Sequence, residues 1–305
     1  MSQKIVLTVV VPAESGCNLK CAGCIIAQRG EARDTLLSHE DYLRFVSETL
    51  SLPEVISFSI QGYEPLLEDA WPLSQQLLRL ASATIAFDGE GKRTQCVTNG
   101  VNLAKFADEL VHITDNIAVS IDSHDAAIHD LSRGKVGAWQ HTVDGVRAVR
   151  KLFGASLEIF QEYLSIVSIL YPGKVHRLER MPELLASLGV KRWTISPLIA
   201  LRKDGYHGDA ERIRADLLHL TSLARAHGVE VQLGDDLRDL ESVGDLYQVL
   251  SVAAIVGDHV VVRLSPDGTL SVGKEILQSS HNIPKWNREE SPREFLHRSI
   301  LRASS

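Results

Sequence analysis

The stretch GCNLKCAGC, residues 16–24, holds three of the four cysteines of the chain. Cys17, Cys21 and Cys24 follow the β-branched run IVLTVVV (5–11), which Pro12 ends, so we expect them on the loop after a first strand. A disulfide framework is not expected in a cytoplasmic protein. Three thiolates at these spacings can point toward one compact centre, so the loop predicts a metal or cluster site.

The number and type of ligands on this loop indicate which metal it would hold. Zinc sites normally bring a fourth ligand or a second ligand pair, and the sequence has no second CxxC and no HxxxH. An iron–sulfur cluster normally takes four cysteines, so three leave one iron open to an outside ligand. An open iron indicates catalysis, although a structural zinc site remains an alternative at this point.

Strand-like and helix-like stretches alternate around this loop. Besides 5–11, strands are predicted at 55–60, 94–97, 117–121, 164–170 and 192–196, and helices at 39–50, 70–81, 103–111, 138–153 and 175–189. The alternation predicts βαβ units on a parallel sheet, either doubly wound or curled into a barrel, with chemistry at the carboxyl ends of the strands. Beyond Pro197 the pattern changes to a helix at 209–227, a strand at 229–234, a hairpin at 260–273 and a short helix in the tail. We therefore expect a main domain over 1–200 and an extension over 201–305 packed on it.

The net charge and the first residues narrow the classes of partner that we expect this protein to bind. The net charge of −7 argues against nucleic acid and suits a cationic or neutral small substrate. The opening MSQKIVLTVVVP is too short for a membrane span and has no signal-cleavage pattern, so we expect a cytoplasmic protein without a membrane partner.

The C-x3-C-x2-C spacing resembles the signature of the radical S-adenosylmethionine (SAM) enzymes. Three further strand ends match in order: Gln61-Gly62-Tyr63-Glu64-Pro65 resembles the Gly-Gly-Glu-Pro motif of that family, Thr98-Asn99-Gly100 a recurring turn, and Val119-Ser120-Ile121-Asp122 a Ser-x-Asp element. The resemblance covers about residues 5–200. It implies an α/β fold in which a partial (β/α)6 TIM-like barrel carries a C-terminal α+β extension.

The same resemblance implies the cofactors and their contacts. Three thiolates would hold a [4Fe–4S] cluster, and SAM would chelate the open iron and be cleaved reductively to a 5′-deoxyadenosyl radical that abstracts a hydrogen atom. A flavodoxin- or ferredoxin-type protein would supply the electron. Glu64 would bind the SAM amino group and Gly62 would let the backbone approach the cofactor. Thr98 and Ser120 would bind its carboxylate or ribose, or only cap strand ends, and Ser196 would line the adenine.

The sequence also departs from the family pattern. Gly23 stands where an aromatic residue commonly precedes the third cysteine, so adenine stacking must come from elsewhere. Tyr63 replaces the second glycine of the motif and would either face substrate or pack under the loop. No cysteine follows Cys96, so we expect a single-cluster member without the auxiliary-cluster cysteines of the SPASM/twitch relatives, with Gly273 where such a cysteine would stand.

The fate of the substrate radical depends on a hydrogen donor. Returning a hydrogen gives epimerisation, losing an electron gives oxidation, and fragmentation gives elimination. Cys96 shares a face of its strand with Thr98 and is a candidate donor if it points into the barrel, although a small buried core residue is the plainer interpretation. Tyr63 is a second candidate donor. Asp122 would act as a general base, pair with a substrate amine, or simply bond Arg133 or the next helix.

Two other features have plainer interpretations. His124 and His129 are five apart, which does not suit metal ligation from one helix face, so we interpret them as solvated or locally bonded. The acidic run at 234–241 indicates a solvated helix start or a patch for a cationic substrate. An epimerase or oxidoreductase of antibiotic biosynthesis, acting on an amino sugar, an aminoglycoside or a peptide, is the favoured hypothesis. A noncatalytic iron–sulfur or metal-binding sensor is the alternative.

Overall fold

The computed structural model describes residues 4–24, 37–85, 93–171, 173–197, 210–234, 259–273 and 283–304. Within these ranges one sheet has the strand order β7-β6-β5-β4-β3-β2-β1-β8-β9. The strands are β1 (Lys4–Val11), β2 (Val55–Gly62), β3 (Arg93–Thr98), β4 (Asn116–Ser120), β5 (Leu164–Leu170), β6 (Arg192–Pro197), β7 (Glu230–Leu233), β8 (His259–Leu264) and β9 (Leu270–Val272). The helices are α2 (His39–Leu50), α3 (Trp71–Ile85), α4 (Leu103–Ile113), α5 (Ala126–Arg133), α6 (Ala138–Leu152), α7 (Leu157–Tyr163), the 3₁₀ turn η2 (Val175–Arg177), α8 (Met181–Ser187), α9 (Ala210–Ala226) and α11 (Pro292–Ser304).

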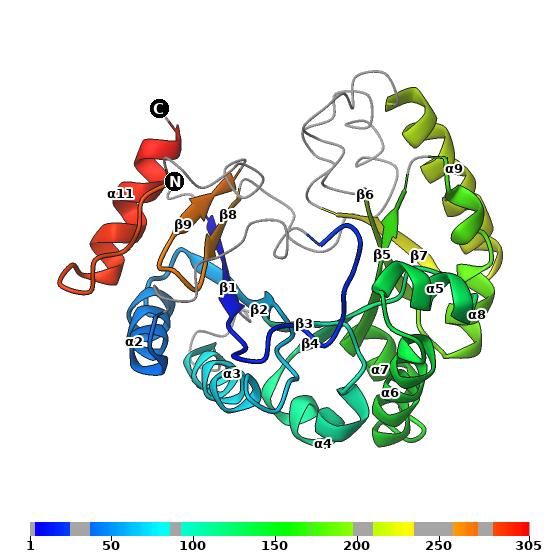
Figure 1. The fold of residues 1–305 in the computed structure, drawn as a ribbon, viewed down its shortest axis with the longest axis horizontal. Helices are drawn as coiled ribbons and strands as arrows, with labels where there is room; N and C mark the ends of the chain where they lie inside the picture. The colour runs from blue at the N-terminus through cyan, green and yellow to red at the C-terminus, as the bar shows by residue number, and fades with distance from the viewer. Residues whose placement is uncertain are drawn as a thin grey trace.

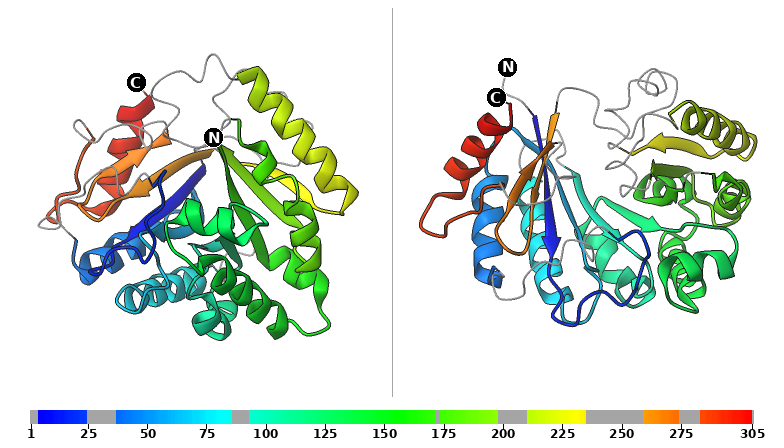
Figure 2. Two further views of the ribbon diagram at one scale, coloured as in Figure 1. Left: turned by 45° about the vertical axis from the view of Figure 1, so that its right-hand side comes forward. Right: turned by 45° about the horizontal axis from the view of Figure 1, so that its top comes forward.

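Neighbouring strands from β7 to β8 are parallel, and only the pair β8–β9 is antiparallel. Figure 1 shows the sheet curved into an arc with α2, α3, α4 and α6 along its outer side, and Figure 2 shows the same helix layer from two further directions. The predicted α/β partial barrel is confirmed. Parallel strands need crossover connections, which is why a helix follows each of the early strands.

The register separates an inner face of the sheet from a helix-facing one. Cys96 of β3 lies between Ile60 and Ile117 of its neighbours, and all three side chains are fully buried in the core. The alternate residues of β3, Gln95 and Val97, are partly exposed. Successive side chains of a strand point to opposite faces, so the helix layer covers the Cys96 side and the inner side of the arc is the more accessible one.

The predicted helix at 175–189 is divided. The structure has η2 first and α8 only from Met181, because Pro182 lacks the N–H that a helix interior needs and is tolerated only in a first turn. The short helices α5 and α7 were not predicted. Asp125 begins α5 by accepting a hydrogen bond from the Ile128 N–H, and Gly134 ends it in the left-handed conformation.

The described strands beyond residue 200 extend the same sheet. β7 pairs with β6, and β8 pairs with β1 from the other side, while α11 packs on α2 and β9. The predicted hairpin is confirmed, with Gly268 at φ +81° in its turn. A domain division near residue 200 stays a prediction. In the described part of the chain, every helix is too short or too polar to cross a bilayer.

Candidate active site

The cysteine loop leaves the carboxyl end of β1 and is fastened to the end of α5. The Lys20 N–H donates to the Arg133 carbonyl at 3.0 Å, and the Cys21 thiol lies 3.9 Å from the same oxygen. Gly134 has φ +64°, and a Cβ there would overlap the Lys20 carbonyl oxygen. Glycine at the α5 C-cap therefore permits this close approach as well as the left-handed turn.

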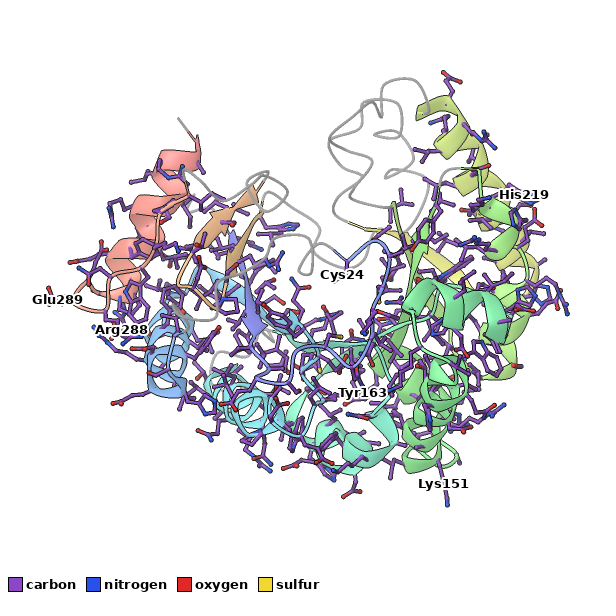
Figure 3. The ribbon with its side chains drawn as sticks, viewed as in Figure 1. Cys24, Lys151, Tyr163, His219, Arg288 and Glu289 are labelled. Atoms are coloured by element: carbon purple, nitrogen blue, oxygen red, sulfur yellow. The ribbon has the colours of Figure 1, made fainter. Side chains whose placement is uncertain are left out.

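The three cysteine side chains are half-buried, and Cys24 lies toward the inner side of the arc (Figure 3). Burial, with smaller contributions from the nearby Glu64, Cys21 and Cys24, raises the pKa of the Cys17 thiol to about 11, against the effect of a hydrogen bond from the Leu19 backbone. Burial also raises the pKa of Cys21, against the effect of the neighbouring Arg133 cation. The thiols are thus close enough to influence one another and are partly shielded from water.

Glu64 connects the ends of β2 and β3. The carboxylate is 2% exposed and accepts three hydrogen bonds, from the Thr98 hydroxyl at 2.6 Å, the Asn99 N–H at 2.7 Å and the Leu66 N–H at 3.0 Å. Burial raises the pKa of Glu64, and these three donors oppose the rise. The Thr98 hydroxyl also accepts a hydrogen bond of 3.0 Å from the Gly100 N–H. This second bond holds the hydroxyl in the orientation in which it donates to Glu64.

Gly62, in the second motif, was expected to let the backbone approach the cofactor, and the structure shows a separate reason for glycine there. Gly62 has φ +132°, and a Cβ there would lie 2.7 Å from Val10 Cγ1 and 3.1 Å from the Val11 backbone. Glycine is therefore required at this position for the close approach of β2 to β1. The next residue, Tyr63, is half-buried, so both interpretations of its phenol remain predictions.

Asn99 joins the Glu64 network to the cysteine loop. Its side-chain amide donates to Asn18 Oδ1 at 2.7 Å and lies 3.9 Å from Cys17 Sγ, and its backbone carbonyl accepts from the Thr142 hydroxyl at 2.9 Å. Sequence reasoning missed Asn18 and Asn99 as site residues. Their signal was present, since both stand inside motifs that were identified, the cysteine stretch and Thr98-Asn99-Gly100.

Asp122 is occupied by structural partners. Its carboxylate accepts from Arg133 at 2.8 Å, the Ser132 hydroxyl at 2.9 Å and the Ile169 N–H at 3.2 Å, and the side chain is 4% exposed. The interpretation that Asp122 bonds Arg133 is confirmed. The expected roles as a general base or a partner of a substrate amine are not what this geometry provides, because the buried ion pair and its donors already engage both carboxylate oxygens.

The ion pair with Asp122 holds the Arg133 side chain beside the cysteine loop. That side chain is 12% exposed, and its guanidinium interacts with the Cys21 thiol and has a buried Nε without a hydrogen-bond partner among the described residues. Tyr171, half-buried after β5, lies within electrostatic reach of the same group, and burial raises its pKa. A guanidinium beside the cysteine loop can bind an anionic group such as a carboxylate.

His129 is buried rather than solvated, contrary to one of the two expected interpretations. Its Nδ1 accepts a hydrogen bond of 3.1 Å from the Asp122 N–H, so the local-bonding interpretation is confirmed. Burial lowers the pKa of His129 to about 4, with the Arg133 cation adding to the effect. The ring is therefore neutral near pH 7.

Ser120 and Ser196 lie on the inner face. Ser120 is partly exposed in register with Val167, and Ser196 is partly exposed in register with Ile169. Both serines stand at carboxyl ends of strands on the accessible side, as cofactor contacts would require. Their contacts with SAM stay predictions.

Cys96 does not reach that side. It is fully buried on the helix-facing side of β3, and burial raises the pKa of its thiol well above the usual value. The shared face with Thr98 was expected correctly, but it is the opposite face from the one a hydrogen donor needs. The condition for a hydrogen donor, that Cys96 points into the barrel, is not met, and the plainer interpretation of a small buried core residue agrees with its place between Ile60 and Ile117.

A family model described as the radical SAM superfamily matches residues 14–173. The chain belongs to the radical SAM superfamily. This match contains the cysteine loop, the Glu64 network and the ion pair of Asp122 and Arg133.

Individual relatives agree with this assignment. An AdoMet-dependent heme synthase of Methanosarcina barkeri is 29% identical over 139 residues, which cover 45% of this chain and 37% of that protein. Native anSMEcpe with bound AdoMet has a TM-score of 0.66 at 16% identity, covering 97% of this chain and 83% of that one. Streptococcus suis SuiB bound to the precursor peptide SuiA has a TM-score of 0.65 at 13% identity, covering 95% of this chain and 64% of SuiB. The chain thus spans less than two thirds of the heme synthase and of SuiB.

The cofactors of a radical SAM protein are a [4Fe–4S] cluster and SAM, and the residues present fit them. No three His, Cys, Asp or Glu side chains in the described ranges converge on a single ion. A cubane cluster offers separate irons to separate thiolates, so the half-buried, mutually interacting Cys17, Cys21 and Cys24 suit it better than one zinc ion. The acidic run at 234–241 lies outside the described residues beyond Gly234, as does the stretch that follows Cys24.

Proposed function

We propose that this radical SAM enzyme removes a hydrogen atom from a C–H bond of a peptide or a small cationic natural product such as an aminoglycoside, leading to oxidation or epimerisation. When bound, the cluster and SAM supply the hydrogen-atom abstraction. The observation that carries the proposal is the joint position of the cysteine loop, Glu64 and Arg133 at the carboxyl ends of β1, β2 and α5. The chain's own residues hold the thiols in place, orient a buried carboxylate and present a cation.

Each of these residues has a task that its geometry supports. Glu64 offers a carboxylate to the SAM ammonium group, and its three donors keep it oriented. Arg133 offers its guanidinium to the SAM carboxylate. Partial burial of the cysteine side chains keeps water away from them.

The substrate class is supported by the relatives and by charge. SuiB is described with the precursor peptide SuiA, and anSMEcpe with the Cp18Cys peptide. The net charge of −7 favours a neutral or cationic substrate over an anionic one.

The burial of Cys96 favours oxidation among the two outcomes. Epimerisation requires a hydrogen atom returned to the substrate, and the described strands place their single thiol on the helix-facing side. Oxidation requires loss of one electron and one proton after the abstraction; the oxidised [4Fe–4S] cluster, when bound, would accept the electron and solvent the proton, so no thiol is needed. Tyr63, half-buried beside Glu64, remains the alternative donor.

The proposal is tested by anaerobic reconstitution with iron and sulfide, reduction with dithionite and addition of SAM, with 5′-deoxyadenosine followed by mass spectrometry. Wild type is expected to produce it, and the variant Cys17→Ala, Cys21→Ala, Cys24→Ala is not. If the loaded wild type forms no 5′-deoxyadenosine with candidate peptides or aminoglycosides present, catalysis is refuted. SAM binding to the loaded protein would then identify a sensor.

Deuterium labelling tests the fate of the substrate. In deuterated buffer, oxidation leaves no solvent deuterium at the substrate carbon, whereas epimerisation through an exchangeable donor introduces it. Cys96→Ala is expected to keep the wild-type product, and Tyr63→Phe is the matched variant for the phenol. Loss of an epimerised product in Cys96→Ala alone would overturn the assignment of Cys96 to the core.

A further inference from the structure

We propose that Asn99 is a positioning residue for the cluster, whose side-chain amide donates to the sulfur of Cys17 and thereby raises the reduction potential of the bound [4Fe–4S] cluster. The inference rests on the proposed function in one respect, because it takes Cys17 as a cluster ligand. It goes further by naming a residue outside the ligand set that controls the reduction step. The orientation of the amide, its rigidity and its distance from the sulfur support it.

The orientation of the Asn99 amide is fixed by a local turn. Its side-chain oxygen accepts a hydrogen bond of 2.9 Å from the Val101 N–H, the turn in which an asparagine side chain bonds the backbone two residues ahead. An amide oxygen can accept from this N–H, whereas the amide nitrogen is only a donor. The NH2 group is therefore on the other side of the amide, where it meets Asn18 and Cys17 of the cysteine loop.

Three further hydrogen bonds hold Asn99 in this position. Its backbone N–H donates to Glu64 Oε2 at 2.7 Å, and its backbone carbonyl accepts from the Thr142 hydroxyl at 2.9 Å. One N–H of the side-chain amide donates to Asn18 Oδ1 at 2.7 Å. The residue is 9% exposed, so water competes little for these groups. The amide is thus a preorganised donor whose ordering is already achieved by the fold.

The second N–H of the same amide is available to a sulfur. Asn99 Nδ2 lies 3.9 Å from Cys17 Sγ, a long N–H···S hydrogen bond, and the Cys17 thiol itself donates to Asn18 Oδ1 at 3.8 Å. Metal binding requires the thiolate, so the Cys17 proton is released to solvent on loading and the sulfur is then only an acceptor. The Asn99 N–H then lies beside a negative sulfur, and its hydrogen bond becomes charge-assisted.

A hydrogen bond to a ligand sulfur favours the reduced state of a cluster. Reduction adds one negative charge to the cluster and its thiolates, and an N–H at the sulfur stabilises this larger charge more than the smaller charge of the oxidised state. Hydrogen bonds to the sulfurs are among the factors that set the potentials of iron–sulfur clusters. The electron comes from an external one-electron reductant such as dithionite, and no bond of Asn99 is formed or broken. Asn99 therefore makes the cluster easier to reduce.

Asn99→Ser tests the amide while it keeps the turn. A serine hydroxyl can still accept from the Val101 N–H, but the shorter side chain moves the donor away from Cys17. The same loop offers a matched control in Asn102, whose side-chain amide donates to the Leu66 carbonyl at 2.9 Å. Asn102→Ser removes an amide hydrogen bond of the same kind, at a partly buried position, that involves no cysteine.

Redox titration of the cluster-loaded proteins, followed by EPR without SAM or substrate, measures the effect. Signals are normalised to the bound iron, so a partly loaded variant still gives a potential. At a fixed potential, the ratio of reduced to oxidised cluster is expected to fall about tenfold in Asn99→Ser, which is a shift of about 59 mV to more negative potential for a one-electron couple. Asn102→Ser is expected to have the wild-type potential.

A second measurement uses the wild-type Asn99 and so does not depend on whether Asn99→Ser binds iron. The asparagine side-chain amides are labelled with ¹⁵N in the variant Asn18→Asp, which keeps an acceptor for Asn99 and removes the neighbouring amide nitrogen. Pulsed EPR of the reduced cluster is expected to detect a ¹⁵N coupling from the Asn99 amide.

The outcomes separate this inference from the proposed function. A wild-type potential in Asn99→Ser, or a shift of the same size in Asn102→Ser, overturns the role of Asn99 even if SAM is cleaved normally. Absence of a ¹⁵N coupling overturns it as well. Because both measurements are made without SAM, they still report on Asn99 if a loaded cluster forms no 5′-deoxyadenosine, the result that refutes the proposed function.

Discussion

The hydroxyl of Thr98 donates a hydrogen bond of 2.6 Å to Glu64 Oε1, so a residue at the end of β3 orients a buried carboxylate at the end of β2. Without donors, an ionised carboxylate that is 2% exposed would be strongly unfavourable. The two strand ends are thus fixed relative to each other by the carboxylate that we propose binds the SAM amino group.

Thr98→Val removes that donor while keeping the side-chain shape. Because a hydrogen bond to a charged group contributes about 1.5–3 kcal/mol, we expect the free energy of unfolding to fall by about that amount. The dissociation constant for SAM should rise about tenfold as Glu64 loses its orientation. Urea unfolding and SAM titration of the loaded protein check both values. Thr98→Ser retains the hydroxyl and should stay near wild type; equal loss in both variants would contradict the role of the hydroxyl.

Gly134→Ala is expected to displace the cysteine loop. Its Cβ would overlap the Lys20 carbonyl, in addition to the strain of about 1–2 kcal/mol for a left-handed alanine. Gly137→Ala is the matched control, since Gly137 has φ +82° in the same turn and nothing closer to an added Cβ than His141 Cδ2 at 3.9 Å. Iron and sulfide content after reconstitution should fall in the first variant and not in the second. Equal iron content in both would show that the contact with Lys20 does not hold the loop.

The sequence was sufficient for the order of strands and for the cysteine loop, because both depend on local patterns of apolar residues and on one short motif. The contacts that assemble the site were not predictable in this way. Asn99 bonds Asn18 across 81 positions, and Arg133 meets Lys20 across more than a hundred, so only the fold brings them together. Because alternate residues of a strand point to the same side, Cys96 and Thr98 are predicted to share a face, but this rule does not say which of the two faces the helices cover.

Asp122→Asn distinguishes a structural from a catalytic carboxylate. Breaking a buried ion pair leaves Arg133 uncompensated, so we expect the free energy of unfolding to fall by about 3–5 kcal/mol and cluster loading to decrease. The 5′-deoxyadenosine formed per loaded cluster should stay within about threefold of wild type. A fall of about a hundredfold or more per loaded cluster, with normal stability, would instead indicate proton transfer by Asp122.

His129 is expected to make the stability pH-dependent. Its pKa is lowered from 6.5 to about 4 in the folded protein, so between these pH values the unfolded chain binds a proton that the folded one does not. The free energy of unfolding should therefore fall by about 3 kcal/mol as the pH drops through this window.

Urea midpoints of wild type and His129→Asn across the same pH range measure that contribution. The variant should show a shallower decline, while His141→Asn, at an exposed position of α6, should follow wild type. Parallel curves for wild type and His129→Asn would contradict the assignment.

The position of β1 inside the sheet has a consequence for synthesis of the protein. β1 pairs with β2 on one side and with β8 on the other, yet β8 is translated about 250 residues later. At ~5–20 residues per second, one edge of the apolar strand IVLTVVV stays unpaired for roughly 12–50 s on the ribosome. An open apolar edge is a template for intermolecular pairing, so the nascent chain is most exposed to aggregation in the interval before the C-terminal strands emerge.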